Sequence, residues 1–191
     1  MKTEAHSFFD AVSSLMALNA ESIELLSSAL KRVEFSKGVM LVKEYTVCDT
    51  IYFIEKGLTR TYYIKDGKDV TDWLSPENTF ACSIISFITR MPDRRIIETL
   101  ELSVCWVLNY YQLEELYQQS HQIERLGRLL VNSGLIQLQK RFDDLHFASA
   151  AERYKTMMQE TPTLLQRVPL GIIASYLGIT QETLSRIRSQ I

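Results

Sequence analysis

Polar side chains that can recognise nucleic-acid bases are crowded near the C-terminus, in the stretch IASYLGITQETLSRIR. Arginine can donate two parallel hydrogen bonds to guanine, glutamate can accept one from cytosine, and glutamine and serine can bond to bases or phosphates. A helix that begins after the glycine of this stretch places these groups on the face that packing does not need. The candidate base- and phosphate-contacting residues are Thr180, Gln181, Glu182, Ser185, Arg186, Arg188 and Ser189.

The elements that must position these groups form a helix-turn-helix pattern. Counted from Leu170, the small residue Ala174 is fifth, where the second helix passes close over the first. Gly178 is ninth and can end the first helix in a left-handed conformation at little cost. Thr180 can cap the second helix, and Glu182 suits its first turn. The wedge between the two helices is expected to consist of Ile173, Leu177, Ile179, Leu184 and Ile187.

The composition is that of an ordinary globular protein and provides no overall basic field. The chain has 191 residues, of which 46% are hydrophobic and 23% are charged, and its formal net charge is −2. Any contact with nucleic acid must therefore come from a local patch. No run approaches the ~20 apolar residues of a membrane helix, and the N-terminus lacks the apolar core of a signal peptide. We therefore expect a cytoplasmic protein without membrane contact.

A long helix without proline is expected upstream of the helix-turn-helix, from His121 to Phe147. At 1.5 Å per residue it would be about 40 Å long, which is more than one small β-rich domain can cover. Its apolar stripe begins with Ile123, Leu126 and Leu130. We expect these three residues to form the interface of a two-fold homodimer. A long core helix inside a single chain is the alternative.

Residues 33–108 have the pattern of a small antiparallel β domain. Short β-rich runs are separated by turn residues, and Asp66-Gly67 suits the positive φ angles of a tight hairpin turn. The expected strands lie within residues 38–44, 50–57, 58–65, 69–74, 95–101 and 103–109. Short strands at this spacing indicate a sandwich or a small barrel. Residues 75–95 interrupt them with a short helical stretch, which we interpret as a functional loop.

Residues that could support catalysis or bind a metal are few and scattered. The histidines are His6, His121 and His146, and the cysteines are Cys48, Cys82 and Cys105. No histidine lies in the strand-rich region, which argues against a metal-dependent enzyme built inside a barrel. The cysteines are widely spaced and odd in number, so we expect buried thiols and no disulfide framework or iron–sulfur cluster. We therefore predict neither an enzyme nor a bound metal or other cofactor.

The order of these parts resembles the Crp/Fnr family of bacterial transcription regulators. The most specific match is ETLSR, from Glu182 to Arg186, which is similar to the recognition-helix signature of the Fnr branch. The stretch IYFIEKGLTRTYY, with Gly57, resembles the family's β-roll turn, and ENTFACSIISF lies where the family has its phosphate-binding cassette. The resemblance implies that Glu182, Ser185 and Arg186 read bases. It also implies a homodimer on palindromic double-stranded DNA, with RNA polymerase as a further partner.

The cassette departs from the cyclic-nucleotide-binding members of that family. Those members carry Phe-x-Gly-Glu, whereas here the phenylalanine is followed by Ala81, Cys82 and Ser83. We therefore expect that cyclic AMP does not bind, and that the pocket holds an unknown, more apolar small-molecule effector or stays empty. The residues expected around this pocket are Phe80, Ser83, Ile84, Ile85, Arg94 and Arg95, where either arginine faces an anion or is a solvated loop charge.

Together these patterns predict an α+β fold. It consists of an N-terminal antiparallel, jelly-roll-like β-roll with flanking helices, a long dimerisation helix and a C-terminal helix-turn-helix. The expected boundaries are 1–118 for the sensor domain, 119–147 for the dimerisation helix and 148–191 for the DNA-binding domain, which begins at a capping box of Ser149 and Glu152. The predicted function is sequence-specific transcription regulation. The alternative is a ligand-sensing or protein-interaction module whose helix-turn-helix does not bind DNA.

Overall fold

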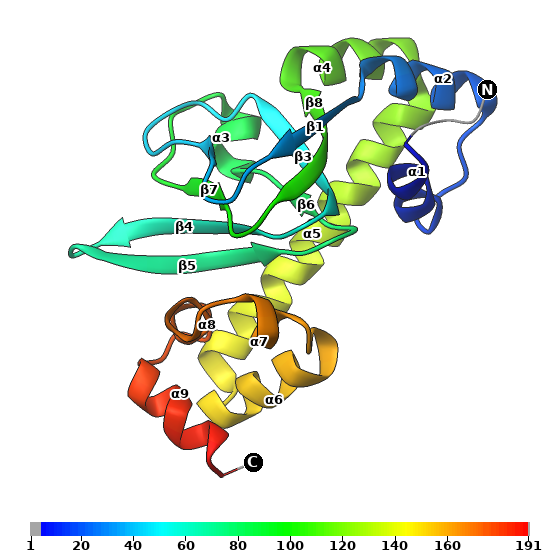
Figure 1. Cartoon of the computed structure of the whole chain (residues 1–191). Coiled ribbons are helices and arrows are strands. Elements are labelled where there is room, and N and C mark those ends of the chain that lie inside the picture. The colour runs from blue at the N-terminus through cyan, green and yellow to red at the C-terminus, as the bar shows by residue number, and fades with distance from the viewer. Residues whose placement is uncertain (1–4, 191) are drawn as a thin grey trace.

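Two antiparallel four-stranded sheets form the centre of the N-terminal half of the computed structural model, which describes residues 5–190 (Figure 1). The strand order is β1-β8-β3-β6 in one sheet and β2-β7-β4-β5 in the other. The strands are β1 (Lys31–Phe35), β2 (Met40–Val42), β3 (Thr50–Lys56), β4 (Thr59–Lys65), β5 (Lys68–Ser75), β6 (Phe80–Ala81), β7 (Ile96–Thr99) and β8 (Ser103–Asn109). With helices before and after these sheets, the predicted α+β fold with an antiparallel β-roll is confirmed.

The predicted hairpin joins β4 to β5. Its turn residues Asp66 and Gly67 have φ angles of +53° and +73°, which are the values that a tight turn between twisted strands requires. Two strands, β1 and β6, were not predicted. The strand β6 has two residues, and β1 is an edge strand with the largely exposed sequence KRVEF. The strand β6 is too short to show alternation, and in β1 the alternation is limited to Arg32–Phe35, which is shorter than a sequence pattern needs to predict a strand.

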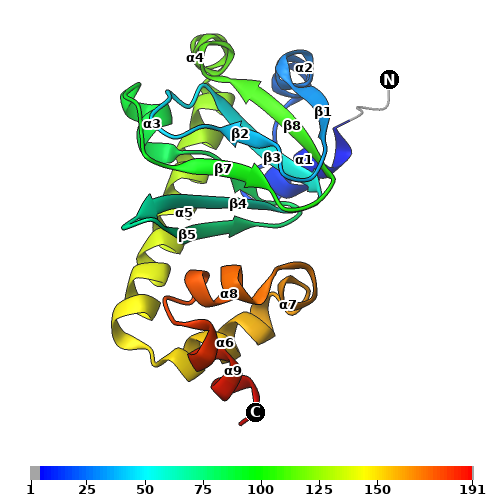
Figure 2. The same ribbon diagram turned by 60° about the vertical axis from the view of Figure 1, so that its left-hand side comes forward.

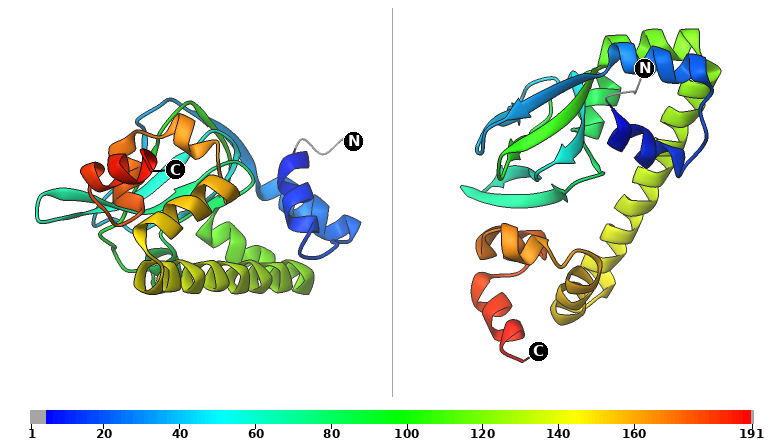
Figure 3. Two further views of the ribbon diagram at one scale, coloured as in Figure 1. Left: turned by 90° about the horizontal axis from the view of Figure 1, so that it is seen from below. Right: turned by 45° about the vertical axis from the view of Figure 1, so that its right-hand side comes forward.

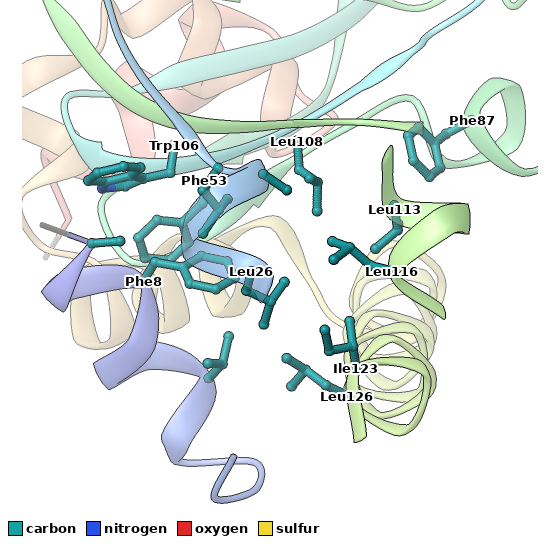
Figure 4. Packing of buried hydrophobic residues seen from close by; sticks show 14 residues of the cluster. Phe8, Leu26, Phe53, Phe87, Trp106, Leu108, Leu113, Leu116, Ile123 and Leu126 are labelled. Carbon is teal, nitrogen blue, oxygen red and sulfur yellow. The ribbon is translucent and has the colours of Figure 1, made fainter. Parts of the chain in front are cut away.

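Successive side chains of β3 and β8 point to opposite faces of their sheet, and a hydrophobic core lies on each face. Tyr52 and Ile54 of β3 pack with Cys105 of β8 and with residues of the second sheet. Phe53 and Trp106 point the other way, because successive strand residues face opposite sides, and they pack under helices (Figure 4). These helices are α1 (His6–Ser13), α2 (Ala20–Ala29), α4 (Tyr110–Gln119) and the first turns of α5 (His121–Phe147).

The helix α5 has the predicted bounds, but its first turns are covered by the chain itself. Ile123 is 1% exposed and Leu126 is 2% exposed within the core under α2 and α4, and Leu130 packs against the edge of that core. The prediction that Ile123 and Leu126 form a dimer interface is therefore wrong, because intrachain contacts already remove them from solvent. The exposed apolar side chains of α5 lie further along, at Val131, Leu135, Ile136, Leu138, Phe142, Leu145 and Phe147.

The helices after α5 form a module that lies against β4 and β5 (Figures 2 and 3). They are α6 (Ala150–Glu160), α7 (Leu164–Arg167), α8 (Leu170–Tyr176) and α9 (Gln181–Arg188). Leu58 and Leu74 of the β-roll join the hydrophobic core of this module. The Thr71 amide donates to Ser175 Oγ at 2.8 Å, and that hydroxyl donates to the Asp69 carbonyl at 3.1 Å. Among the described residues, no helix is long and apolar enough to cross a membrane.

Candidate nucleic-acid interface and effector region

The helix-turn-helix packs as its spacing predicts. Ala174 is 2% exposed in the core shared by α8 and α9, and Gly178 has a φ angle of +68°. A β-carbon at Gly178 would lie 3.3 Å from Leu145 Cδ2, so backbone conformation and space both favour glycine. The wedge residues are all in this core, where Ile173, Leu177, Leu184 and Ile187 are buried and Ile179 is partly buried. This packing leaves the opposite face of α9 in solvent.

Five polar residues lie together on the exposed face of α9. They are Gln181, Glu182, Ser185, Arg186 and Ser189. The Arg186 guanidinium donates a hydrogen bond of 3.4 Å to Thr183 Oγ1. A bond of this length is weak, so the guanidinium can turn to another acceptor at little cost. The backbone N–H of Glu182 and the Thr180 hydroxyl hold the pKa of the Glu182 carboxyl below its ordinary value. At neutral pH this group is therefore an acceptor.

The other two predicted contact residues lie outside this group. The Thr183 amide donates to Thr180 Oγ1 at 3.2 Å, so Thr180 caps α9 as predicted. Arg188 is exposed in the last turn of α9. The structure thus brings five of the seven predicted residues together and gives Thr180 a structural role.

Two arginines that carry no signal in the sequence position the helix-turn-helix. Arg141 of α5 donates to the Asp72 carbonyl at 2.9 Å and to the Tyr176 carbonyl at 2.8 Å, which links β5 to the end of α8. Arg153 of α6 donates to the Leu177 carbonyl at 3.0 Å. A charged residue on an amphipathic helix ordinarily predicts solvent exposure. Only the tertiary structure brings these arginines to carbonyl groups far away in the sequence.

An arginine and two aspartates form a closed ion-pair network in the predicted effector region. Arg95 donates to Asp72 Oδ2 at 2.7 Å and to Asp93 Oδ2 at 2.9 Å, and the buried Ser83 hydroxyl donates to the same Asp93 oxygen at 2.7 Å. Burial acts to raise the pKa of Asp93, but the hydrogen bonds from Ser83 and Arg95 lower it further, so the pKa lies below its ordinary value. Arg95 is therefore neither a solvated loop charge nor available to an anion without displacing carboxylates.

The remaining residues of the predicted pocket lie in three different environments. The ring of Phe80 packs in the core, 5.1 Å from that of Phe53 between centroids. The Arg94 guanidinium lies 4.4 Å from the centre of the Tyr63 ring. Ile84 and Ile85, at the start of α3 (Ile84–Thr89), are 41% and 53% exposed. These two isoleucines are therefore presented to solvent by α3, and their place in an effector pocket stays a prediction.

The cysteines also differ from expectation. Cys48 and Cys105 are buried thiols, as predicted, but Cys82 is partly exposed. Although 34 positions separate Cys48 from Cys82 in the sequence, their Sγ atoms lie 3.9 Å apart. The spacing of the cysteines gave no signal of this contact.

Comparisons with known proteins agree with this architecture. Residues 32–120 match the family described as the cyclic nucleotide-binding domain. No curated protein matches the chain.

Solved structures of regulators share the fold over most of their length. FixK2 from Bradyrhizobium japonicum superposes with a TM-score of 0.72 at 19% identity, over 84% of this chain and 83% of that chain. The c-di-GMP-responsive global regulator CLP from Xanthomonas campestris superposes with a TM-score of 0.70 at 15% identity, over 90% of this chain and 91% of that chain. A protein described as a transcriptional regulator of the Crp/Fnr family from Eubacterium rectale superposes with a TM-score of 0.68 at 16% identity, over 89% of this chain and 82% of that chain. Residues 32–120 are therefore similar to the cyclic nucleotide-binding domain, and the chain has the fold of Crp/Fnr-type regulators, as its motifs predict.

Proposed function

We propose that the protein is a sequence-specific DNA-binding transcription regulator of the Crp/Fnr type. The observation that carries this proposal is the exposed polar face of α9, while the opposite face packs in the core. The residues of this exposed face are Gln181, Glu182, Ser185, Arg186 and Ser189. A recognition helix needs one face that packs and another that is exposed, since base edges are read by side chains that do not support the fold. We assign residues 1–118 to the sensor domain, 119–147 to the dimerisation helix and 148–191 to the DNA-binding domain.

The test is selection of duplexes from a random pool, followed by affinity measurements over a range of salt concentrations. Arg186→Ala is expected to weaken binding to the selected sequence by ~1–3 kcal/mol, which is the value of one bidentate base contact. Binding to unselected DNA should fall much less. Arg125→Ala removes the same charge from an exposed position in the first turns of α5, the end of that helix that lies near α2 and α4 and away from α9 (Figure 1), and should change neither affinity.

Two results would contradict the proposal in different ways. Equal losses of specific and non-specific affinity in Arg186→Ala would make this arginine a phosphate contact. Failure to enrich any sequence, with the two arginine variants behaving alike, would favour the alternative module that does not bind DNA.

We propose that two copies pair along the second half of α5 to give a homodimer that reads inverted half-sites. The exposed residues Val131, Leu135, Leu138, Phe142 and Leu145 are four and three positions apart in alternation, which is the heptad spacing of a coiled-coil seam. A two-fold pair of recognition helices would address half-sites about 34 Å apart, one turn of B-DNA.

Sedimentation tests this pairing. Leu138→Asp, which places a charge in the seam, should give folded monomers that lose DNA affinity. Gln137→Asp adds the same charge at an exposed position off the seam and should remain dimeric. A wild-type monomer at micromolar concentration would contradict the proposal.

We further propose that the effector region has lost the ability to bind cyclic nucleotides. A cyclic nucleotide needs a cation for its phosphate, and Arg95 is already paired with Asp72 and Asp93. A phosphate at this position would meet two carboxylates, and like charges at short range are destabilising. An effector, if one acts here, would differ in chemistry. RNA polymerase as a partner stays an expectation from the resemblance, and a cytoplasmic location stays one from the N-terminal sequence and the cysteines.

A further inference from the structure

Two cysteines far apart in the sequence lie in contact where the effector region meets the strands. Cys48 lies just before β3, and Cys82 follows β6 directly and precedes α3. Their Sγ atoms are 3.9 Å apart, and Cys48 Sγ is also 3.4 Å from the Thr50 carbonyl. The sulfurs need to approach by about 1.9 Å to reach the ~2.05 Å length of a disulfide.

The segments that carry the two sulfurs are held together by contacts of their own. The Cys48 amide donates to Ser86 Oγ at 2.9 Å, and the Arg90 guanidinium donates to the Cys48 carbonyl at 3.0 Å. A backbone bridge joins Thr46 to Asp93 on the same side. These contacts keep the thiols near each other in the folded protein, so their reaction is effectively unimolecular.

We propose that Cys48 and Cys82 form a peroxide-sensitive thiol pair, which is oxidised to an intramolecular disulfide by hydrogen peroxide. The Cys48 thiolate attacks one oxygen of the peroxide, so that an S–O bond forms, the O–O bond breaks and water leaves after protonation. The Cys82 sulfur then attacks the Cys48 sulfenic acid, so that the S–S bond forms and a second water leaves. The two thiols lose two electrons and two protons, and the peroxide is reduced to two waters.

The surroundings assign different roles to the two thiols. The hydrogen bond from Cys82 lowers the pKa of Cys48 to about 7, although burial acts to raise it. The same hydrogen bond, with burial, raises the pKa of Cys82 strongly. Cys48 is therefore the thiolate that attacks and Cys82 the resolving thiol. Cys82 is partly exposed while Cys48 is 1% exposed, so peroxide has to enter beside Cys82 to reach the Cys48 thiolate.

Cys105 provides an internal control within the same fold. It is fully buried among residues of the strands, and burial raises its pKa to about 11. A thiol in that state is nearly unreactive. Oxidation of the pair without oxidation of Cys105 therefore distinguishes a specific reaction of Cys48 and Cys82 from general oxidation of the protein.

The experiment is oxidation of the purified full chain with hydrogen peroxide, followed by blocking of free thiols and mass spectrometry of the tryptic peptides. Cleavage after lysine and arginine places the three cysteines on separate peptides, residues 44–56, 69–90 and 96–125. Peptides 44–56 and 69–90 should appear joined, with the mass of two hydrogen atoms missing. Free thiols should fall from three to one and return to three with dithiothreitol, and Cys105 should react at least about tenfold more slowly.

Serine variants separate the steps. In Cys82→Ser the disulfide should be absent, and Cys48 should accumulate as a sulfenic acid that dimedone captures. In Cys105→Ser the cross-link should form as in the wild type, and circular dichroism checks that each variant is folded. The proposal is overturned if three thiols persist in excess peroxide, if peptide 96–125 is cross-linked or oxidised as fast as the other two, or if only intermolecular disulfides form.

Discussion

Arg167 of α7 links the C-terminal helical module to the β-roll, and its removal is a direct test of how the two parts are held together. Its guanidinium donates to both oxygens of Glu77, at 2.8 and 2.9 Å, and to both oxygens of Glu101, at 2.5 and 3.3 Å. The Arg167 side chain is 23% exposed, and those of its partners are 34% and 35% exposed. Arg167→Ala would leave two carboxylates facing each other without a cation between them.

The loss in free energy of unfolding that we expect for Arg167→Ala lies between two limits. Hydrogen bonds to charged groups contribute ~1.5–3 kcal/mol each where they are desolvated, whereas exposed ion pairs contribute ~0–1 kcal/mol. Partial exposure of all three groups indicates an intermediate loss of about 2 kcal/mol for Arg167→Ala. For a chain of this length that corresponds to a fall in melting temperature of about 4–8 °C.

A double-mutant cycle measures this coupling. Arg167→Ala is compared with the wild type and with the same substitution in a Glu77→Gln, Glu101→Gln background, by urea and thermal unfolding followed by circular dichroism. Glutamine at position 77 retains an oxygen for the Gly57 amide, which donates to Glu77 Oε1 at 2.9 Å. In that background the arginine substitution should cost less than about 0.5 kcal/mol, as expected for sites that no longer interact.

The pH dependence provides an independent check. Burial acts to raise the pKa of Glu77, but hydrogen bonds from Arg167 and from backbone amides lower it further, so it lies below the ordinary value of 4.5. A carboxyl with a lowered pKa in the folded state stabilises above its unfolded pKa, and this contribution is lost as pH falls through the folded value. The difference in free energy of unfolding between wild type and Arg167→Ala should therefore be largest at pH 7 and should shrink below pH 4.5. Equal losses in both backgrounds, or a deficit that persists in acid, would refute the reasoning.

Three further predictions follow from single contacts. Isothermal titration with cyclic AMP and cyclic GMP should detect no micromolar binding, since Arg95 is already neutralised; micromolar affinity for either would contradict the lost cassette. Ser149→Ala should destabilise the protein by ~1 kcal/mol in urea unfolding, because Ser149 Oγ accepts from the Glu152 amide and Glu152 accepts in return from the Ser149 amide; an unchanged midpoint would show that α6 does not need its capping box. Leu126→Asp should lower stability by more than ~3 kcal/mol and give poorly folded protein, unlike Leu138→Asp; a stable folded monomer from Leu126→Asp would place that residue at an interface after all.

Local signals in the sequence determined several elements without knowledge of the tertiary structure. The turn at Asp66-Gly67, the cap at Thr180 and the left-handed Gly178 each depend on residues within a few positions of one another. The bounds of α5 and the wedge of the helix-turn-helix follow from helical periodicity in the same way. Such features are predictable because a helix or a turn is closed by hydrogen bonds between near neighbours.

Only the tertiary structure decided which faces are covered and which charged groups are paired. The apolar stripe of α5 is continuous in the sequence, but α2 and α4 bury Ile123 and Leu126 and leave Leu138 exposed. The partners of Arg167 lie 90 and 66 positions away in the sequence, and four strands with their loops separate Cys48 from Cys82 along the chain. Contacts of this kind impose no periodicity on the residues between them. They arise when separate elements pack, because burial is shared among surfaces that the chain brings together only on folding.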